Sequence, residues 1–227
     1  MNIRVKFSKH GVLKYIGHLD LMRYFQKAFR RTDIRVSYST GFSPHMIMSF
    51  AHPLSVGTES DAEYFDVSLD DEEDVLDIKN KLNSAMADGI EIINVVKLPE
   101  KAENAMASVA AADYEIVFTG KNPFTPEIIN NFKNEREIIV TKETKKTVKT
   151  FNIKEFIFDI SINDKNNLFF CTDASSSGNL KPAFLVDTLF LFAGITDTSE
   201  FKYHIFRKEI YKRNADNKLI PLDFYEQ

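Results

Sequence analysis

The chain opens with alternating hydrophobic and charged residues. Ile3, Val5 and Phe7 are apolar, and Arg4 and Lys6 lie between them. A period of two residues is typical of a β-strand that buries one face and leaves the other in water. We therefore predict a strand at residues 3–7 with its cations on the outer face.

The period then changes to that of an amphipathic helix. Between about Leu19 and Arg31, the residues Leu21, Phe25 and Phe29 recur at helical spacing and predict one buried face. The opposite face carries basic residues, namely Arg23, Lys27, Arg30 and Arg31. This helix therefore presents a positive stripe to solvent.

Four further elements complete this half of the chain. Alternation resumes at residues 34–38 and 63–69, which predicts two more strands. The acidic residues 70–74 favour the start of a second helix, because they would lie at the positive end of its dipole. Gly89 suits the position just after that helix, and residues 90–98 predict a last strand. This order of elements is that of the ferredoxin-like motif.

The second half repeats the pattern less regularly. We predict an α+β fold of two ferredoxin-like (βαββαβ) domains in tandem, the second of them decorated. The expected bounds are residues 1–98 for the first domain, 99–112 for a linker, 113–213 for the second domain and 214–227 for a peripheral C-terminal tail.

Charge is distributed unevenly along the chain. Residues 1–50 contain nine Lys and Arg against two Asp, a net charge of +7, whereas residues 51–113 contain four against fifteen acids, a net charge of −11. A strongly positive segment attracts anionic partners such as RNA. The alternative is a set of solvated faces that are sorted by charge and have no partner.

The first and third predicted strands suggest where RNA would bind. These strands are neighbours in a ferredoxin-like sheet, so Arg4 and Lys6 are expected beside Tyr64 on an open face. Cations with an aromatic ring bind single-stranded RNA through phosphates and stacked bases, unless other elements cover the face. The residues predicted to bind nucleic acid are Arg4, Lys6, Lys9, Lys14, Arg23, Arg30, Arg31, Phe42, His45 and Tyr64.

A long connection follows the second predicted strand. Its sequence from Ser39 to His45 is Ser-Thr-Gly-Phe-Ser-Pro-His, and further apolar residues follow. Such side chains are unfavourable in water, so the segment is expected to be packed or to bind a ligand. One possibility is a binding loop shaped by Phe42 and His45. The other is a cap under which Phe42, Met48 and Phe50 complete the core.

Candidate catalytic residues lie around the start of the first helix. His18 and Asp20 stand there, with Arg23 one turn later. If His45 folds nearby, the group resembles an acid–base or phosphate-binding site, since an imidazole titrates near neutral pH. The alternative is that His18 is merely the helix N-cap. The histidine spacing selects no metal, and none is expected.

A second anion site is suggested by the turn before the last predicted helix. Ser and Gly residues there can direct backbone N–H groups outward, and Pro182 suits the first helical position. The alternative is an ordinary helix-entry turn. The candidate anion-binding residues are Ser177, Gly178, Asn179 and Lys181.

The cysteine count limits the chemistry. Cys171 is the single cysteine, whereas an iron–sulfur cluster or a cysteine-based zinc site needs several thiolates. We therefore expect no cofactor in this chain. A lone cysteine also fits a reducing compartment, the cytoplasm. No window of about 18 uncharged apolar residues predicts a membrane span.

Two runs of the first half resemble a known family. They are VKFSKHGVLKYIGHLDLMRYFQKAFRR and SYSTGFSPHMIMSFAHPLSVGTESDAEYFDV. Both closely resemble the bacterial radical-SAM-linked protein family, a domain of unknown function found beside or fused to a radical S-adenosylmethionine enzyme. The likeness covers residues 1–113, and the Ser-Gly-Asn-Leu-Lys-Pro turn extends it. The chain departs at Gly17, usually Ser, and at Met46, usually Pro. The resemblance implies a cytoplasmic accessory protein.

Three hypotheses for the function follow. The leading one is a non-catalytic accessory protein that binds RNA, such as tRNA or rRNA, for modification by a radical S-adenosylmethionine enzyme. An alternative is a metal-independent ribonuclease or RNA-modifying transferase that uses His18 or His45 as a base. The third is a protein-interaction subunit that binds no nucleic acid.

Overall fold

The computed structural model describes residues 1–143 and 148–225 and divides the chain into two compact units. The first unit comprises Met1–Ala110 together with the residues from Glu209 onward, and the second comprises Ala111–Lys208. These bounds differ from the expected ones, because residues 99–110 of the expected linker and the expected tail belong to the first unit. The last two residues of the expected tail lie outside the described residues.

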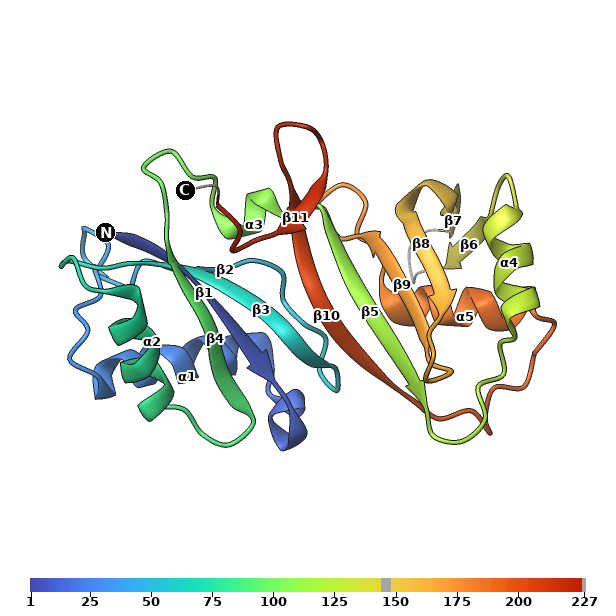
Figure 1. Cartoon of the computed structure of the whole chain (residues 1–227), viewed down its shortest axis with the longest axis horizontal. Helices are drawn as coiled ribbons and strands as arrows, with labels where there is room; N and C mark the ends of the chain where they lie inside the picture. The colour runs from blue at the N-terminus through green and yellow to red at the C-terminus, as the bar shows by residue number, and fades with distance from the viewer. Residues whose placement is uncertain (144–147, 226–227) are drawn as a thin grey trace. The chain divides into compact units, whose positions relative to one another are not determined.

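The first unit contains an antiparallel sheet in the order β4-β1-β3, and β2 pairs with the other edge of β3 (Figure 1). Its elements are β1 (Asn2–Lys9), the short 3₁₀ helix η1 (Gly11–Tyr15), α1 (His18–Arg31), β2 (Met48–Phe50), β3 (Glu59–Ser68), α2 (Val75–Ser84), β4 (Ile90–Lys97) and α3 (Ala105–Ser108).

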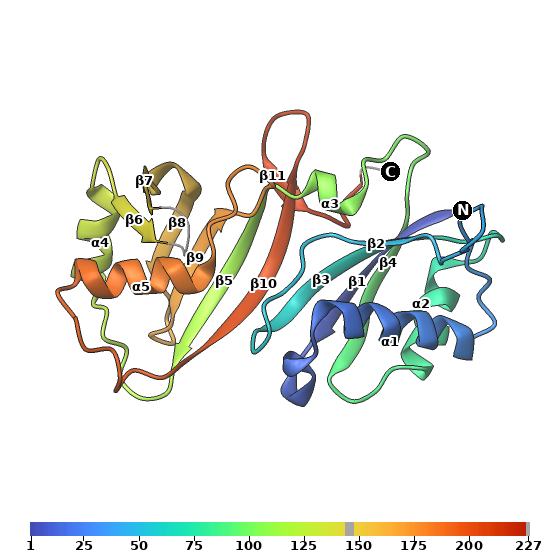
Figure 2. The same cartoon turned by 180° about the vertical axis from the view of Figure 1, so that it is seen from behind.

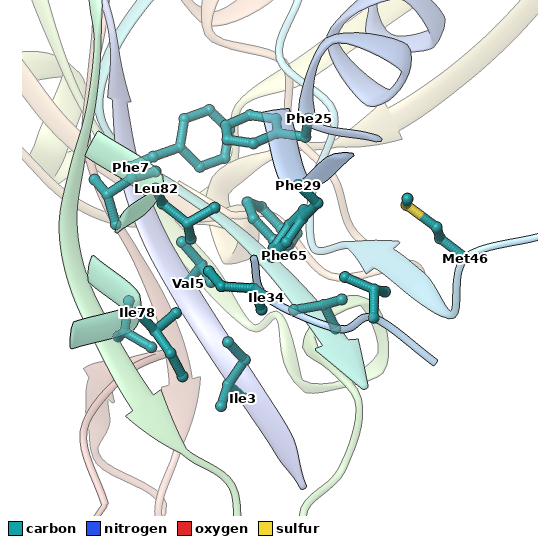
Figure 3. Packing of buried hydrophobic residues seen from close by; sticks show 14 of the residues in the cluster. Ile3, Val5, Phe7, Phe25, Phe29, Ile34, Met46, Phe65, Ile78 and Leu82 are labelled. Carbon is teal, nitrogen blue, oxygen red and sulfur yellow. The ribbon is translucent and has the colours of Figure 1, made fainter. Parts of the chain in front are cut away.

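The core of this unit lies between the sheet and its two longer helices. Ile3, Val5 and Phe7 are fully buried, which confirms the face predicted for β1. Helices α1 and α2 cover that face, as Figure 2 shows. Phe25 and Phe65 pack at a centroid distance of 4.8 Å within the aromatic cluster of Figure 3. The apolar stripe of α1 packs against the inner face of β1 because removing both apolar surfaces from water is favourable.

The two helices begin differently. The N-cap of α1 is Gly17 and has no side-chain hydrogen bond, so the alternative that His18 caps this helix is wrong. Asp74 caps α2 and accepts hydrogen bonds from the N–H groups of Leu76 and Asp77. Gly89 was expected just after the end of α2, but that helix ends earlier, at Ser84. Gly89 lies against His10, where an added Cβ would be 2.7 Å from the His10 carbonyl oxygen.

The strand predicted at residues 34–38 is wrong. This segment makes isolated bridges, Val36 to Leu69 and Tyr38 to Met46, and the regular strand beside β3 is β2. Ile34 and Val36 are buried at 5% and 6% exposure. Their alternation therefore reports burial without a regular ladder.

The C-terminal segment is part of the first unit and is not peripheral, contrary to expectation. The strand β10 (Tyr203–Arg213) enters this unit at Glu209 and pairs with β11 (Leu219–Pro221). Leu222 is fully buried. The expected linker likewise contains α3, whose Ala105 is fully buried.

The second unit contains strands in the order β10-β5-β9-β8 and a separate hairpin of β6 and β7. Helix α5 starts at Pro182, as predicted from the sequence, and Leu185, Val186 and Leu189 are fully buried. Its remaining elements are β5 (Ala111–Phe118), α4 (Pro126–Asn134), β6 (Ile139–Glu143), β7 (Val148–Asn152), η2 (Lys154–Phe156), β8 (Ile157–Ile162), β9 (Leu168–Asp173) and α5 (Pro182–Phe192).

The fold class is mixed α+β, as predicted. Among the described residues, no helix is both long and apolar enough to span a membrane.

Candidate functional site

The outer face of β1 is not an open RNA-binding surface. Arg4 is completely buried. Its Nε donates to Asp66 Oδ1 at 2.7 Å and its Nη2 to Asp66 Oδ2 at 3.0 Å. Two backbone carbonyls, of Glu103 and Leu222, accept its remaining hydrogen bonds at 3.0 and 2.9 Å. The expectation that Arg4 contacts nucleic acid is therefore wrong.

The Arg4–Asp66 pair connects β1, β3 and the segment that leads into α3. Asp66 Oδ2 also accepts from the N–H of Ala105 at 2.6 Å, so the segment before α3 is tied to the sheet. Burial disfavours the charge on Arg4, but the hydrogen bonds and charge of Asp66 outweigh it, so the pKa of Arg4 is raised. A charge pair satisfied in this way is structural.

Lys6 and Tyr64 are committed to a second network. Lys6 Nζ lies 2.5 Å from Glu209 Oε2. The Tyr64 hydroxyl donates to Glu209 at 2.6 Å and lies 3.1 Å from Asp223. Burial, together with both carboxylates, raises the pKa of Tyr64 well above its ordinary value. Tyr64 is 1% exposed, so its ring cannot stack on a base as expected.

The remaining cations near β1 do not extend the expected surface. Lys9 is 1% exposed. Lys14 pairs with Glu59 at 3.4 Å, with both side chains largely buried. Arg35 pairs with Asp71. The positive segment therefore does not form one continuous patch, because four of its nine cations are largely buried and Arg35 is paired with Asp71.

The outer face of α1 is the part of the predicted basic surface that remains in solvent. Its four cations, Arg23, Lys27, Arg30 and Arg31, are exposed. Arg23 pairs with Asp20 at 3.1 Å, and Arg31 donates to the carbonyl of Ala85 at 2.7 Å. Lys27 and Arg30 make no ion pair or side-chain hydrogen bond within the described part of the chain. We call this set the α1 stripe.

Exposed apolar side chains lie near the start of α1, and they were not predicted from the sequence. Val12 and Tyr15 of η1 are 80% and 65% exposed, and Leu19 in the first turn of α1 is 61% exposed. The loop with Val56 joins them, because the Gly57 N–H donates to the Lys14 carbonyl at 2.9 Å. A helical wheel would have shown Leu19 on the basic face, but the short η1 has no periodic signal.

The Ser39–His45 loop is closed by hydrogen bonds between its two ends. The Ser39 N–H donates to the His45 carbonyl at 2.9 Å, and the His45 N–H donates to Ser39 Oγ at 3.1 Å. Ser39 Oγ also lies 2.8 Å from His45 Nδ1. Phe42 at the tip is fully exposed, whereas Met46 and Phe50 are buried. The alternative of a cap that completes the core is therefore confirmed for Phe50 and Met48, which pack in or against the core, and wrong for Phe42.

The candidate catalytic residues are not brought together. The His18 ring packs edge-on against Phe50 at a centroid distance of 5.4 Å. Asp20 is exposed and pairs with Arg23. Within the described residues, no hydrogen bond or ion pair links His45 to His18, Asp20 or Arg23. The predicted acid–base group is thus not formed in this structure.

A cavity of about 470 Å³ lies beside the Ser39–His45 loop within the first unit. Its polar lining from the sheet consists of Asn2, Ser49, Asp66 and Ser68. Residues of the loop, including His45, form one wall, and residues 98–104 form another. The Arg4–Asp66 pair holds the second wall, because it binds Glu103 and Ala105.

The turn before α5 satisfies its own donors. Asp173 Oδ1 accepts from the N–H and the hydroxyl of Ser175, both at 2.7 Å. Gly178 lies against the Asp173 carboxyl group, and its N–H donates to Ser175. A carboxylate already occupies the place expected for an anion. The predicted anion site, formed by Ser177, Gly178, Asn179 and Lys181, is therefore unfavourable.

A half-buried lysine lies near the Arg4 network. Lys212 Nζ is 3.3 Å from the centroid of the Tyr225 ring, and Arg4 lies over the same ring at 5.8 Å. Burial, aided by the charge of Arg4, lowers the pKa of Lys212 to about 8. No local sequence pattern predicts this site, since its members come from opposite ends of the chain.

Comparisons with known proteins give a family but no function. The model of a family described as "Uncharacterized protein conserved in bacteria (DUF2344)" matches residues 2–182. No curated protein matches the chain. One similar solved chain belongs to a "Cbf5-Nop10-Gar1 Complex", with 11% sequence identity and a TM-score of 0.47, over 93% of this chain and 50% of that one. This chain thus spans about half the length of that chain, and a similarity this weak carries no argument.

Proposed function

This chain belongs to an uncharacterized family conserved in bacteria, and we propose that it is an accessory protein that binds RNA through the α1 stripe. One observation carries the proposal: four cations share one solvent face, and Lys27 and Arg30 among them have no internal partner within the described residues. Uncompensated cations in a row attract the phosphate backbone of a nucleic acid.

The geometry of the α1 stripe supports contact with more than one phosphate. Residues 23 to 31 of a helix span about 12 Å, at about 1.5 Å per residue, which exceeds one phosphate spacing along a strand. Tyr15 and Leu19 extend the same region with exposed rings and methyl groups. Aromatic groups beside cations favour single-stranded RNA, because unstacked bases can rest on them.

The test is the salt dependence of binding. Fluorescence anisotropy with a labelled oligouridylate should show an affinity that falls by roughly 50-fold between about 50 and 200 mM salt, if all four cations contact phosphates. The double variant Lys27→Glu, Arg30→Glu should bind at least about tenfold more weakly. Its plot of log affinity against log salt should be shallower by about 0.7 for each lost contact. An affinity that does not change with salt, or that is the same in this double variant, would refute the proposal.

A matched variant controls for net charge. Lys121 and Lys218 are exposed cations outside α1. The double variant Lys121→Glu, Lys218→Glu changes the net charge by the same amount and should keep nearly the parental affinity. An equal loss in both double variants would indicate non-specific electrostatic attraction to surface cations, without a site on α1.

We further propose a radical S-adenosylmethionine enzyme as the partner that acts on the bound RNA. The resemblance of residues 1–113 to the radical-SAM-linked family supports this partner. The chemistry of this chain agrees, because one cysteine cannot hold an iron–sulfur cluster. We expect such an enzyme to copurify with this protein. Nuclease treatment or the Lys27 and Arg30 changes should reduce the amount that copurifies.

Docking to a partner protein without RNA is a second candidate function. The exposed side chains of Val12, Tyr15, Leu19 and Val56 favour it, since clustered apolar groups at a surface often mark interfaces. A double variant Val12→Ser, Leu19→Ser should then weaken copurification of the enzyme, while anisotropy with oligouridylate stays unchanged. The RNA proposal predicts that nuclease treatment matters more than these two substitutions.

We also propose that each unit is one ferredoxin-like domain. The first unit has the order β1, α1, β2, β3, α2, β4, with β1 between β3 and β4. In the second unit, β5, α4, β8, β9, α5 and β10 follow the same order once the β6–β7 hairpin is set aside, and β5 lies between β9 and β10. Both orders support the motif.

A further inference from the structure

The cavity beside the Ser39–His45 loop has a fixed frame. Its wall at residues 98–104 is anchored by Arg4 and Asp66, which are joined by two hydrogen bonds in a buried setting. The opposite wall is anchored by the paired ends of the Ser39–His45 loop. A cavity held at both sides is preorganised, so a ligand entering it loses little free energy to reordering of the protein.

Several hydrogen-bond donors on this lining are unused. Asn104 Oδ1 accepts from the Ala107 N–H at 2.9 Å, which directs its amide NH₂ group elsewhere. Asn2 Oδ1 accepts from the Ser68 hydroxyl at 2.7 Å in the same way. Within the described residues, the two amide nitrogens and the Ser49 hydroxyl make no hydrogen bond to protein. Asn2 and Asn104 are exposed residues of the lining, so their amide N–H groups are available to an incoming group.

The charges of the lining select against an ionic ligand. Among the described residues, no Lys or Arg lines the cavity and Glu100 adds a carboxylate, so a phosphate group would be repelled and would find only the imidazole of His45 as a partner. Asp66 is already neutralised by Arg4 and bound by the Ala105 N–H. Apolar contacts come from Met46, Met48 and neighbouring aliphatic groups. The lining thus suits a neutral, flat molecule with several acceptors.

We infer that this cavity binds a single nucleoside, with the carbonyl groups of its base held by Asn2 and Asn104 and its face against Met48. A volume of about 470 Å³ is within the range of small-molecule sites, roughly 300–1,000 Å³. The inference rests on the proposed RNA-binding function and assigns a place to one base of the RNA. Proteins that recognise RNA commonly take unstacked bases into such sites.

The donor-rich lining predicts which base binds best. Uracil carries two carbonyl acceptors and one ring N–H, whereas guanine carries more donors than acceptors on the equivalent edge. Donors that face donors remain unpaired, and each unpaired group weakens binding. Uridine should therefore bind most tightly of the four nucleosides, and guanosine most weakly.

The test uses methionine methyl groups in the full chain. Met46 and Met48 line the cavity, whereas Met22, Met86 and Met106 do not. With ¹³C-methyl methionine, titration of uridine should shift the Met46 and Met48 signals saturably and leave those of Met22, Met86 and Met106 in place. Guanosine should produce weaker shifts. No saturable shift with any nucleoside, or equal shifts of all the methyl groups, would overturn the inference.

Asn104→Asp provides a sharp variant, because aspartate also caps a helix and keeps the acceptor for the Ala107 N–H. It removes the amide donor and places a negative charge near a carbonyl. Uridine affinity should fall at least about tenfold. Asn130→Asp, at an exposed position of α4, carries the same charge change and should not alter the titration. Equal affinity in the parent and in Asn104→Asp would contradict the site.

A second readout separates this inference from the proposed function. The anisotropy assay with oligouridylate reports on the α1 stripe, and the methyl shifts report on the cavity. If uridine causes no methyl shifts while RNA binding remains salt-dependent, the cavity inference alone is wrong. If uridine causes the shifts but the Lys27 and Arg30 changes leave RNA affinity unchanged, the proposal for the α1 stripe alone is wrong.

Discussion

Two neighbouring sets of cations in the first unit have opposite fates. On β1, Arg4 is completely buried and Lys6 is paired with Glu209. On α1, Lys27 and Arg30 lie in solvent and make no contact with a carboxylate among the described residues. Both sets belong to the same strongly positive segment of the sequence. Net charge along a chain therefore does not identify a binding surface, because each cation must first be traced to its surroundings.

Arg4→Met tests the buried set and should have the largest effect. Removing the guanidinium leaves Asp66 without its counter-charge in a buried position, which costs about 3–5 kcal/mol of folding free energy. Urea denaturation measures the loss. The matched variant is Arg30→Met in the α1 stripe, for which we expect a change within about 0.5 kcal/mol. Similar losses at both positions would remove the distinction between the two sets.

A double variant shows whether the lost counter-charge is the cause. Asp66→Asn removes the carboxylate charge and keeps an oxygen that accepts from the Ala105 N–H. Combined with Arg4→Met, it should recover part of the stability that Arg4→Met alone loses. If the double variant is no more stable than Arg4→Met, packing of the arginine side chain matters more than its charge.

Tyr64→Phe tests the second network on the same face. Its hydroxyl hydrogen-bonds Glu209 and Asp223, and its loss removes one donor from these partly buried carboxylates, which keep Lys6 and Asn94 as partners, at a cost of about 1–3 kcal/mol. Tyr15→Phe removes the same hydroxyl from an exposed ring and should leave the midpoint of urea unfolding unchanged. An unchanged midpoint for Tyr64→Phe would mean that water replaces its hydroxyl in the folded protein.

Local patterns explain what the sequence predicted correctly. The period of two in β1 identified Ile3, Val5 and Phe7 as core residues, and the helical period of α1 identified its basic face. Both predictions need only neighbouring residues. The prediction that the β1 cations are exposed was wrong because the groups that cover them are remote in sequence. Arg4 and Leu222 are 218 residues apart, and no local signal reports such a contact.

The candidate site was predictable in part for the same reason. The unusual composition of Ser39–His45 marked a loop next to the cavity, but its closure by the Ser39 side chain is a tertiary detail. The cavity also needs Asn2 and Asn104, which lie in separate segments without a shared motif. In the turn before α5, the sequence suggested an anion site, and the side chain of Asp173 supplied the anion.

Lys212→Met tests a cation that lies between the two extremes. Its pKa, lowered to about 8 by burial and by Arg4, means that the folded state holds the proton less tightly than the unfolded chain. Asp223 and Asp66 oppose that effect. The cost of burying the charge is therefore complete below about pH 8, decreases as the pH rises toward the ordinary value of 10.5, and is absent above it.

The variant should therefore be more stable than the parent at pH 7, and its advantage should disappear near pH 10. The gain should stay below about 1 kcal/mol, because water still screens this half-buried group. Thermal unfolding of both proteins across this pH range measures the difference. A loss of stability at pH 7 would mean that the contact of the ammonium with the Tyr225 ring outweighs its burial.

Arg31→Gln should have the smallest effect on stability, and it examines the boundary between the two sets. Arg31 lies in the exposed α1 stripe and yet donates to the carbonyl of Ala85 at 2.7 Å. It also stands in the last turn of α1, where a cation is favoured by the helix dipole by about 0.3–1 kcal/mol. Urea unfolding should detect a loss of about 0.5 kcal/mol that diminishes at high salt.

Oligouridylate affinity should fall less in Arg31→Gln than in Arg30→Gln, since a side chain held by Ala85 is less free to reach a phosphate. A larger loss of RNA affinity for Arg31→Gln than for Arg30→Gln would mean that an internal partner does not remove a cation from binding, and the comparison between β1 and α1 would then depend on burial alone.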